Sequence, residues 1–104
     1  ELASAELQQR QQQQAQQLAR QLAFAARSLA FAERFLRNSE ELLAEVREEA
    51  KAGQRTKAEV NEHEIALLDA QMETFNARAN LMLKTADFLG LLDADPLTEK
   101  IRVP

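Results

Sequence analysis

Apolar residues in the first half of the chain recur at alternating intervals of three and four residues. This alternation is the seam of a coiled coil, along which one helix packs against another. A second apolar stripe runs beside the seam and contains Phe24, Ser28, Phe31, Phe35 and Leu42. The seam itself, with Ser39 as a polar member, consists of Ala15, Leu18, Leu22, Ala25, Leu29, Ala32, Leu36, Ser39, Leu43, Val46 and Ala50.

The second half of the chain repeats this arrangement, again with two apolar stripes on one helix. One stripe consists of Val60, Leu67, Thr74, Leu81 and Phe88, with Ala70 and Ala77 between them. The other consists of Ile65, Leu68, Met72, Phe75, Ala79, Met82, Ala86 and Leu89.

Two stripes on each helix indicate packing partners on two sides. A simple pair of helices buries one stripe per helix and leaves the other in water. Exposure costs about 1.5–3 kcal/mol for each large apolar side chain relative to burial, so we expect a further partner. The pattern fits a helix that sits between two neighbours in a wall of helices. It fits a dimeric four-helix bundle equally well.

Glycine and proline delimit these two helices. Only Gly53, Gly90, Pro96 and Pro104 interrupt the chain, and the stretches between them are rich in good helix formers. Gly53 can adopt a positive φ and end the first helix. We also expect Gly90 to end the second helix, because glycine is favoured just beyond a helix C-terminus and Pro96 disfavours continuation.

The start of the second helix is marked by Thr56 and, three residues later, Glu59, which is the spacing of a capping box. The sequence therefore predicts an all-α fold, a long antiparallel coiled-coil hairpin over residues 1–92. Its helices are expected at about 3–52 and 57–90, with a tip turn at 53–56 and an extended tail at 93–104. The residues predicted to form helix–helix contacts are Leu22, Phe24, Leu29, Phe31, Phe35, Leu36, Leu43, Ile65, Leu68, Met72, Phe75, Met82 and Leu89.

Charge and composition argue against several functions. The net charge is −4, with acidic and basic residues interspersed, so no basic face is present to bind nucleic acid. The chain has no cysteine, and His63 is its only histidine. His63 and Glu59 share a helix face but are too few to hold a metal. No nucleophile–base arrangement or phosphate-binding loop is present. We therefore predict neither an enzyme nor a metal or cofactor site.

The residues around the turn resemble the TolC family of outer-membrane efflux channels. The resemblance covers about residues 20–92 and rests on Ala52-Gly53-Gln54-Arg55-Thr56, Val60, Leu67-Leu68-Asp69-Ala70-Gln71, Asn76-Ala77-Arg78 and Leu89-Gly90. The similarity is to the C-terminal periplasmic helical hairpin of a protomer. Two departures stand out: Ala50 occupies a position that is tyrosine in many members, and Asn61-Glu62-His63 replaces a Leu-Asp-Ala stretch.

The resemblance implies a transport function on the periplasmic side of the outer membrane of a Gram-negative bacterium. Family protomers form trimers in which β-strands build a barrel in the membrane and long helices build a periplasmic tunnel. Membrane contact would come only through parts outside these 104 residues. The hairpin tip, here Gly53, Gln54, Arg55 and Thr56, would meet a periplasmic adaptor protein. The resemblance also matches Arg55 to an arginine that can tie one tip to a neighbour.

Two other functions fit the helical pattern. One is the coiled-coil hairpin of a periplasmic adaptor or scaffold protein that bridges partners. The pattern is also compatible with a stand-alone dimeric helical bundle. β-rich sequence flanking the hairpin would separate the first two: barrel strands indicate a channel, and a lipoyl-like domain indicates an adaptor.

Overall fold

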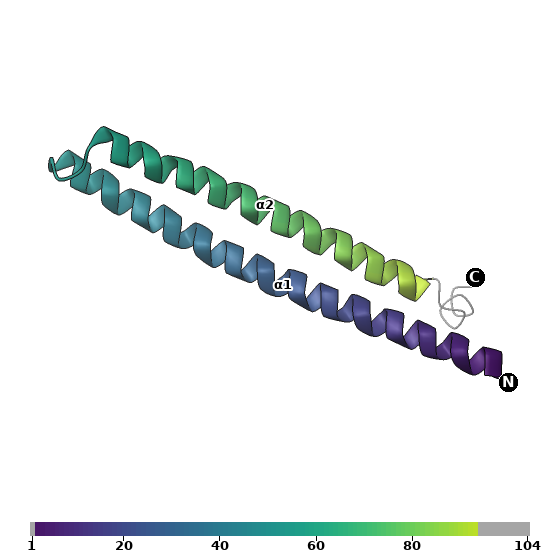
Figure 1. Ribbon diagram of the computed structural model, residues 1–104. Coiled ribbons are helices and arrows are strands. Elements are labelled where there is room, and N and C mark those ends of the chain that lie inside the picture. Colours follow the sequence, from purple (N-terminus) through teal and green to yellow (C-terminus); the bar gives the residue numbers. More distant parts are fainter. Residues whose placement is uncertain (1, 94–104) are drawn as a thin grey trace. The chain divides into compact units, whose positions relative to one another are not determined.

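The computed structural model describes residues 2–93, and the side chains of residues 3–91 (Figure 1). Helix α1 spans Leu2–Lys51 and helix α2 spans Lys57–Asp93. Within residues 2–93 there is no strand, which confirms the all-helical prediction. Neither helix has an apolar stretch sufficient to cross a membrane. The predicted tail lies outside the described residues, apart from Asp93, which is helical.

Gly90 does not end the second helix as predicted, because α2 continues through it to Asp93. Gly90 does not adopt a positive φ; among the described residues only Gly53 does. A glycine inside a helix costs only about 1 kcal/mol relative to alanine. The intervening residues are good helix formers, so one glycine weakens the helix without ending it.

The chain divides into two compact units. One comprises residues 27–79, which hold the connection between the helices. In this unit the Oγ1 of Thr74 lies 3.3 Å from the carbonyl oxygen of Ala32. Nearer the connection, the Nη2 of Arg47 lies 3.3 Å from the Oε1 of Glu64. A later residue of α1 thus lies beside an earlier residue of α2, so the two helices run in opposite directions within this unit.

The core of residues 27–79 consists mostly of small side chains, with one buried leucine. Ala32, Leu43, Val46, Ala70 and Thr74 are buried, and the largest side chains that are fully buried are Val46 and Thr74. The Thr74 hydroxyl also lies 2.8 Å from the carbonyl oxygen of Ala70, so its polar group is satisfied inside the core. Small side chains at these positions allow the two helix backbones to approach closely.

The second unit includes residues 2–26 and 80–93 among those described. Ala25 is buried, while Leu22, Leu81 and Phe88 are half-buried. Residues 3–14, which include most of a glutamine-rich run, are exposed at every position. The inward face of this unit therefore begins at Ala15, the first half-buried residue of α1.

Candidate interaction surfaces

The chain leaves α1 through a Schellman motif centred on Gly53. Gly53 has a φ of 77°, and its N–H donates to the carbonyl of Ala50 at 3.0 Å. The N–H of Gln54 donates to the carbonyl of Glu49 at 2.8 Å. These two bonds satisfy carbonyls that would otherwise lack partners at the end of a helix. The predicted role of Gly53 in ending the first helix is confirmed.

Helix α2 begins with the capping box that Thr56 and Glu59 predict. The backbone N–H of Glu59 donates to the Oγ1 of Thr56 at 3.1 Å. In return, the backbone N–H of Thr56 donates to the Oε1 of Glu59 at 3.3 Å. Two N–H groups at the start of the helix are therefore satisfied by side chains. Thr56 and Glu59 thus have a structural role at this position.

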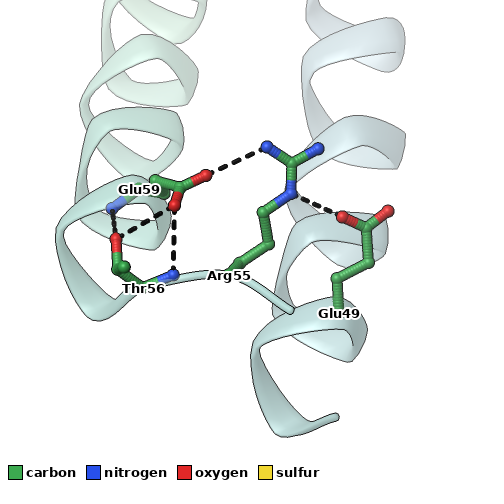
Figure 2. Close-up of polar contacts among 4 residues, drawn as sticks. All are labelled: Glu49, Arg55, Thr56 and Glu59. Atoms are coloured by element: carbon green, nitrogen blue, oxygen red, sulfur yellow. Dashed lines mark hydrogen bonds and ion pairs between the residues drawn. The ribbon is translucent and has the colours of Figure 1, made fainter. Parts of the chain in front are cut away.

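Arg55 joins the two helix ends, as Figure 2 shows. Its Nε donates to the Oε2 of Glu49 on α1 at 2.6 Å, and its Nη1 donates to the Oε2 of Glu59 on α2 at 3.0 Å. We name Glu49, Arg55 and Glu59 the turn clamp. The sequence did not indicate Glu49, because a spacing of six residues across a turn matches no helical pairing rule.

The turn clamp changes the ionisation of its members. The hydrogen bond to Glu49, followed by that to Glu59, raises the pKa of Arg55 further above its usual range. The hydrogen bond from Arg55, followed by that from the Thr56 backbone, lowers the pKa of Glu59 below its usual value of 4.5. The side chains are partly exposed to water, which screens the attraction between them. The clamp therefore orients Arg55 more than it stabilises the fold.

The largest apolar side chains of residues 27–79 lie on the outside. We define the α1 stripe as Phe31, Phe35 and Leu42, and the α2 stripe as Ile65, Leu68, Met72 and Phe75. All seven are exposed, from 45% for Leu42 to 70% for Phe75. A shallow hollow on the α2 stripe is lined by Leu68, Gln71, Met72, Phe75 and Asn76.

The structure separates the predicted helix-packing residues into two groups. Leu22, Leu29 and Leu36 are half-buried and Leu43 is buried, so the seam of α1 forms its inward face. On α2 the inward face is the stripe that contains Val60, Leu67 and Thr74. The remaining predicted residues are exposed in the chain: Phe24, Phe31, Phe35, Ile65, Leu68, Met72, Phe75, Met82 and Leu89.

His63 is partly buried on the inward face of α2. Both carboxylate oxygens of Glu59, four residues earlier, are engaged by Thr56 and Arg55. The described residues contain no cluster of three or more His, Asp or Glu side chains that could hold a metal ion.

Gly53, Gln54, Arg55 and Thr56 are all exposed, so the predicted tip residues are accessible.

No protein-family model, curated protein or solved structure matches the chain. The functional proposal below therefore depends on the turn, the two exposed stripes and the resemblance of the residues around Gly53.

Proposed function

We propose that the chain is a structural component of a transport system, namely the periplasmic helical hairpin of a TolC-like outer-membrane efflux or secretion channel. In this proposal α1 and α2 form a long antiparallel coiled coil whose tip is the turn at residues 53–56. The hairpin is one element in a wall of helices, and the tip meets a periplasmic adaptor. Channel assembly makes the protein a homo-oligomer, a trimer in the full-length family.

The observation that carries this proposal is the exposure of two rows of large apolar side chains. Phe31 is 67% exposed and Phe75 is 70% exposed, although each belongs to a regular helical stripe. Burying each such side chain against a neighbour is worth about 1.5–3 kcal/mol. A wall of helices covers both rows, because every hairpin in it has a neighbour on each side.

The turn supplies the proposed contact surface for the adaptor. Gly53 and Thr56 fix the backbone, while Gln54 and Arg55 present polar side chains on the exposed turn. The guanidinium of Arg55 has five N–H groups. Its bonds to Glu49 and Glu59 use two of them, so donors remain for a partner. An arginine held by its own chain loses less side-chain entropy when it binds.

Photo-crosslinking in cells tests the tip contact. A photoreactive amino acid at Gln54 is expected to form an adduct with a periplasmic adaptor, identified by mass spectrometry. The same amino acid at the exposed Gln9, in the other compact unit, serves as the matched control and is expected to give no such adduct. An identical adduct pattern at the two positions would exclude the turn as the contact surface.

Arg55→Ala measures the contribution of Arg55 to that contact. We expect a crosslinking yield at Gln54 lowered by about threefold or more, as for the loss of a charge-assisted hydrogen bond. Far-UV circular dichroism should be unchanged and the melting temperature lowered only slightly, because the clamp is partly exposed. An unchanged yield would show that Arg55 serves only the turn. Fractionation of cells, with the protein followed in the outer-membrane fraction, distinguishes the proposed channel function from the two alternatives, an adaptor hairpin and a stand-alone bundle.

A further inference from the structure

A hollow between α1 and α2 lies in the compact unit that includes residues 2–26 and 80–93. It has a volume of about 600 Å³, within the range of about 300–1,000 Å³ that is usual for small-molecule sites. It contains no residue of the α1 stripe, the α2 stripe or the turn clamp. We name it the basic hollow, and its lining residues are Gln17, Arg20, Gln21, Phe24, Asn80 and Lys84.

The lining residues of the basic hollow recur at helical spacing. Gln17 and Gln21 are four residues apart on α1, and so are Arg20 and Phe24. On α2, Asn80 and Lys84 have the same separation. Residues three or four apart share one face of a helix. Each wall of the hollow is therefore a single face of one regular helix, which holds its side chains on a rigid backbone.

The charge of the basic hollow is positive and is not compensated by acidic neighbours. Residues 7–26 and 80–86 contain no aspartate or glutamate. Within the described part of the chain, neither Arg20 nor Lys84 belongs to an ion pair. This holds even for Asp87, three residues after Lys84. The two cations therefore favour a negatively charged ligand.

Lys84 occupies a position of the inward stripe of α2. Leu81, Lys84 and Phe88 are all half-buried and follow one another at intervals of three and four residues. A half-buried ammonium group has lost part of its hydration, which an anion at hydrogen-bond distance can replace. A lysine at such a position can also serve only to fix the register of the two helices. The two roles predict different results for the affinity of an anion.

The other lining residues define the rest of the ligand. The side-chain amides of Gln17, Gln21 and Asn80 supply N–H donors without adding charge. The guanidinium of Arg20 can bind a carboxylate or phosphate through two N–H groups. The ring of Phe24 is 65% exposed and provides an apolar surface for a flat group.

We infer that the basic hollow binds an organic anion in which a carboxylate, sulfonate or phosphate is joined to an aromatic body. The anionic group lies between Arg20 and Lys84, and the aromatic body packs on Phe24. Inorganic phosphate would leave Phe24 in water, and a neutral aromatic compound would leave both cations without a partner. The inference goes beyond the proposed function, because it requires no assembly, adaptor or membrane.

Nuclear magnetic resonance of the purified, isotope-labelled chain tests this site. The probe is 8-anilinonaphthalene-1-sulfonate. Its titration should shift the side-chain amide signals of Gln21 and Asn80 and approach saturation. The exposed amides of Asn38 and Gln54, which lie outside the hollow, serve as internal controls and should not shift.

Two further probes separate the parts of the ligand. N-phenyl-1-naphthylamine has the same rings without the sulfonate, and inorganic phosphate has an anionic group without rings. Both should bind at the amides of Gln21 and Asn80 at least about fivefold more weakly than the sulfonate. Equal affinity of the neutral probe and the sulfonate would show that only apolar contact occurs, and equal affinity of phosphate would show a site for a bare anion.

Substitution of Lys84 measures the contribution of its charge. Lys84→Gln should raise the Kd of the sulfonate by about fivefold or more, and Lys84→Arg should retain binding within about twofold. Lys57→Gln is the matched control, because Lys57 is exposed and outside the hollow. It should leave the Kd unchanged. Circular dichroism at each step verifies that the helices persist.

Arg20→Gln provides a second variant, because Arg20 is exposed and its loss should not affect folding. It should weaken binding to a similar degree, whereas Arg27→Gln, at an exposed position outside the hollow, should not. An unchanged Kd in both Lys84→Gln and Arg20→Gln would overturn the inference and leave Lys84 a role in helix pairing only. Signals that shift at Gln71 and Asn76 alone would place the probe on the α2 stripe instead. None of these results depends on adaptor binding, which the crosslinking at Gln54 measures separately.

Discussion

The inward and outward faces of residues 27–79 differ in the size of their side chains. Inside, the helices meet through Ala32, Val46 and Ala70, all buried. Outside, Phe31 and Phe75 are more than half exposed. The three phenylalanines and the methionine of residues 27–79 are thus all on the faces that the chain leaves in water. In a helix pair that functioned alone, the large side chains would be expected inside, where each contributes most to folding.

This difference separates two tasks of the same helices. The inward face brings α1 and α2 together through small residues and leucines, of which Leu43 is buried. The outward face holds most of the apolar area that remains to be buried, so it is where association can gain free energy. The matched substitutions at Val46 and Phe75 test this division directly, and smaller effects are expected at the two glycines and at Glu59 of the turn clamp.

The largest effect is expected for a charge on the inward face. Val46 is 1% exposed, so Val46→Asp places an unpaired carboxylate in the core and should cost roughly 3–5 kcal/mol. Phe75→Asp is the matched change at a 70% exposed position and should alter the stability of the single chain by less than about 0.5 kcal/mol. Thermal melts followed by circular dichroism at low concentration measure both. Equal losses of helicity would contradict the division between faces.

An intermediate effect is expected at the two glycines, which lie outside both stripes. Gly53→Ala places a side chain at a φ of 77° and should destabilise the chain by about 1–2 kcal/mol, although nothing lies within 4 Å of the added carbon. Gly90→Ala lies inside α2 and should stabilise it by about 0.5–1 kcal/mol. Urea unfolding curves give both values. If both substitutions changed the free energy of unfolding in the same direction, the result would contradict the backbone conformations described for these two glycines.

The smallest effect is expected from acidification. The folded state lowers the pKa of Glu59 below 4.5, chiefly through its hydrogen bond with Arg55. The contribution of ionised Glu59 to the free energy of unfolding is therefore complete above pH 4.5. It is lost as the pH falls through the pKa of the folded state, because the unfolded state takes up the proton first. Glu59→Gln should remove this part of the pH dependence of the melting temperature. Glu41→Gln, an exposed change outside the turn, should leave it in place.

The sequence was sufficient to predict the parts of the fold that follow from local rules. The seam of α1, the positive φ at Gly53 and the capping box of Thr56 each depend on neighbouring residues in one helix or turn. The choice between the two stripes of α2 was not predictable, because both repeat with the same period. Which one faces inward depends on how α2 packs against α1, and the period of the stripes does not reveal this.

Three further features illustrate the same limit. The prediction that Gly90 ends α2 was wrong because a local preference of about 1 kcal/mol was outweighed by the surrounding helix formers. Glu49 was missed as a partner of Arg55 because the two meet only after the chain reverses. Cross-helix contacts such as that of Thr74 with Ala32 likewise depend on register, which spacing along one helix does not reveal.

The fixed register between Ala32 and Thr74 constrains how related proteins could vary in length. One extra residue in α2 between the turn and Leu67 would rotate the rest of that helix by about 100° and turn Thr74 out of the core. A whole heptad returns each side chain to its face, but it also shifts one helix past the other. Length variants that keep both faces should therefore gain or lose seven residues in α1 and seven in α2 together.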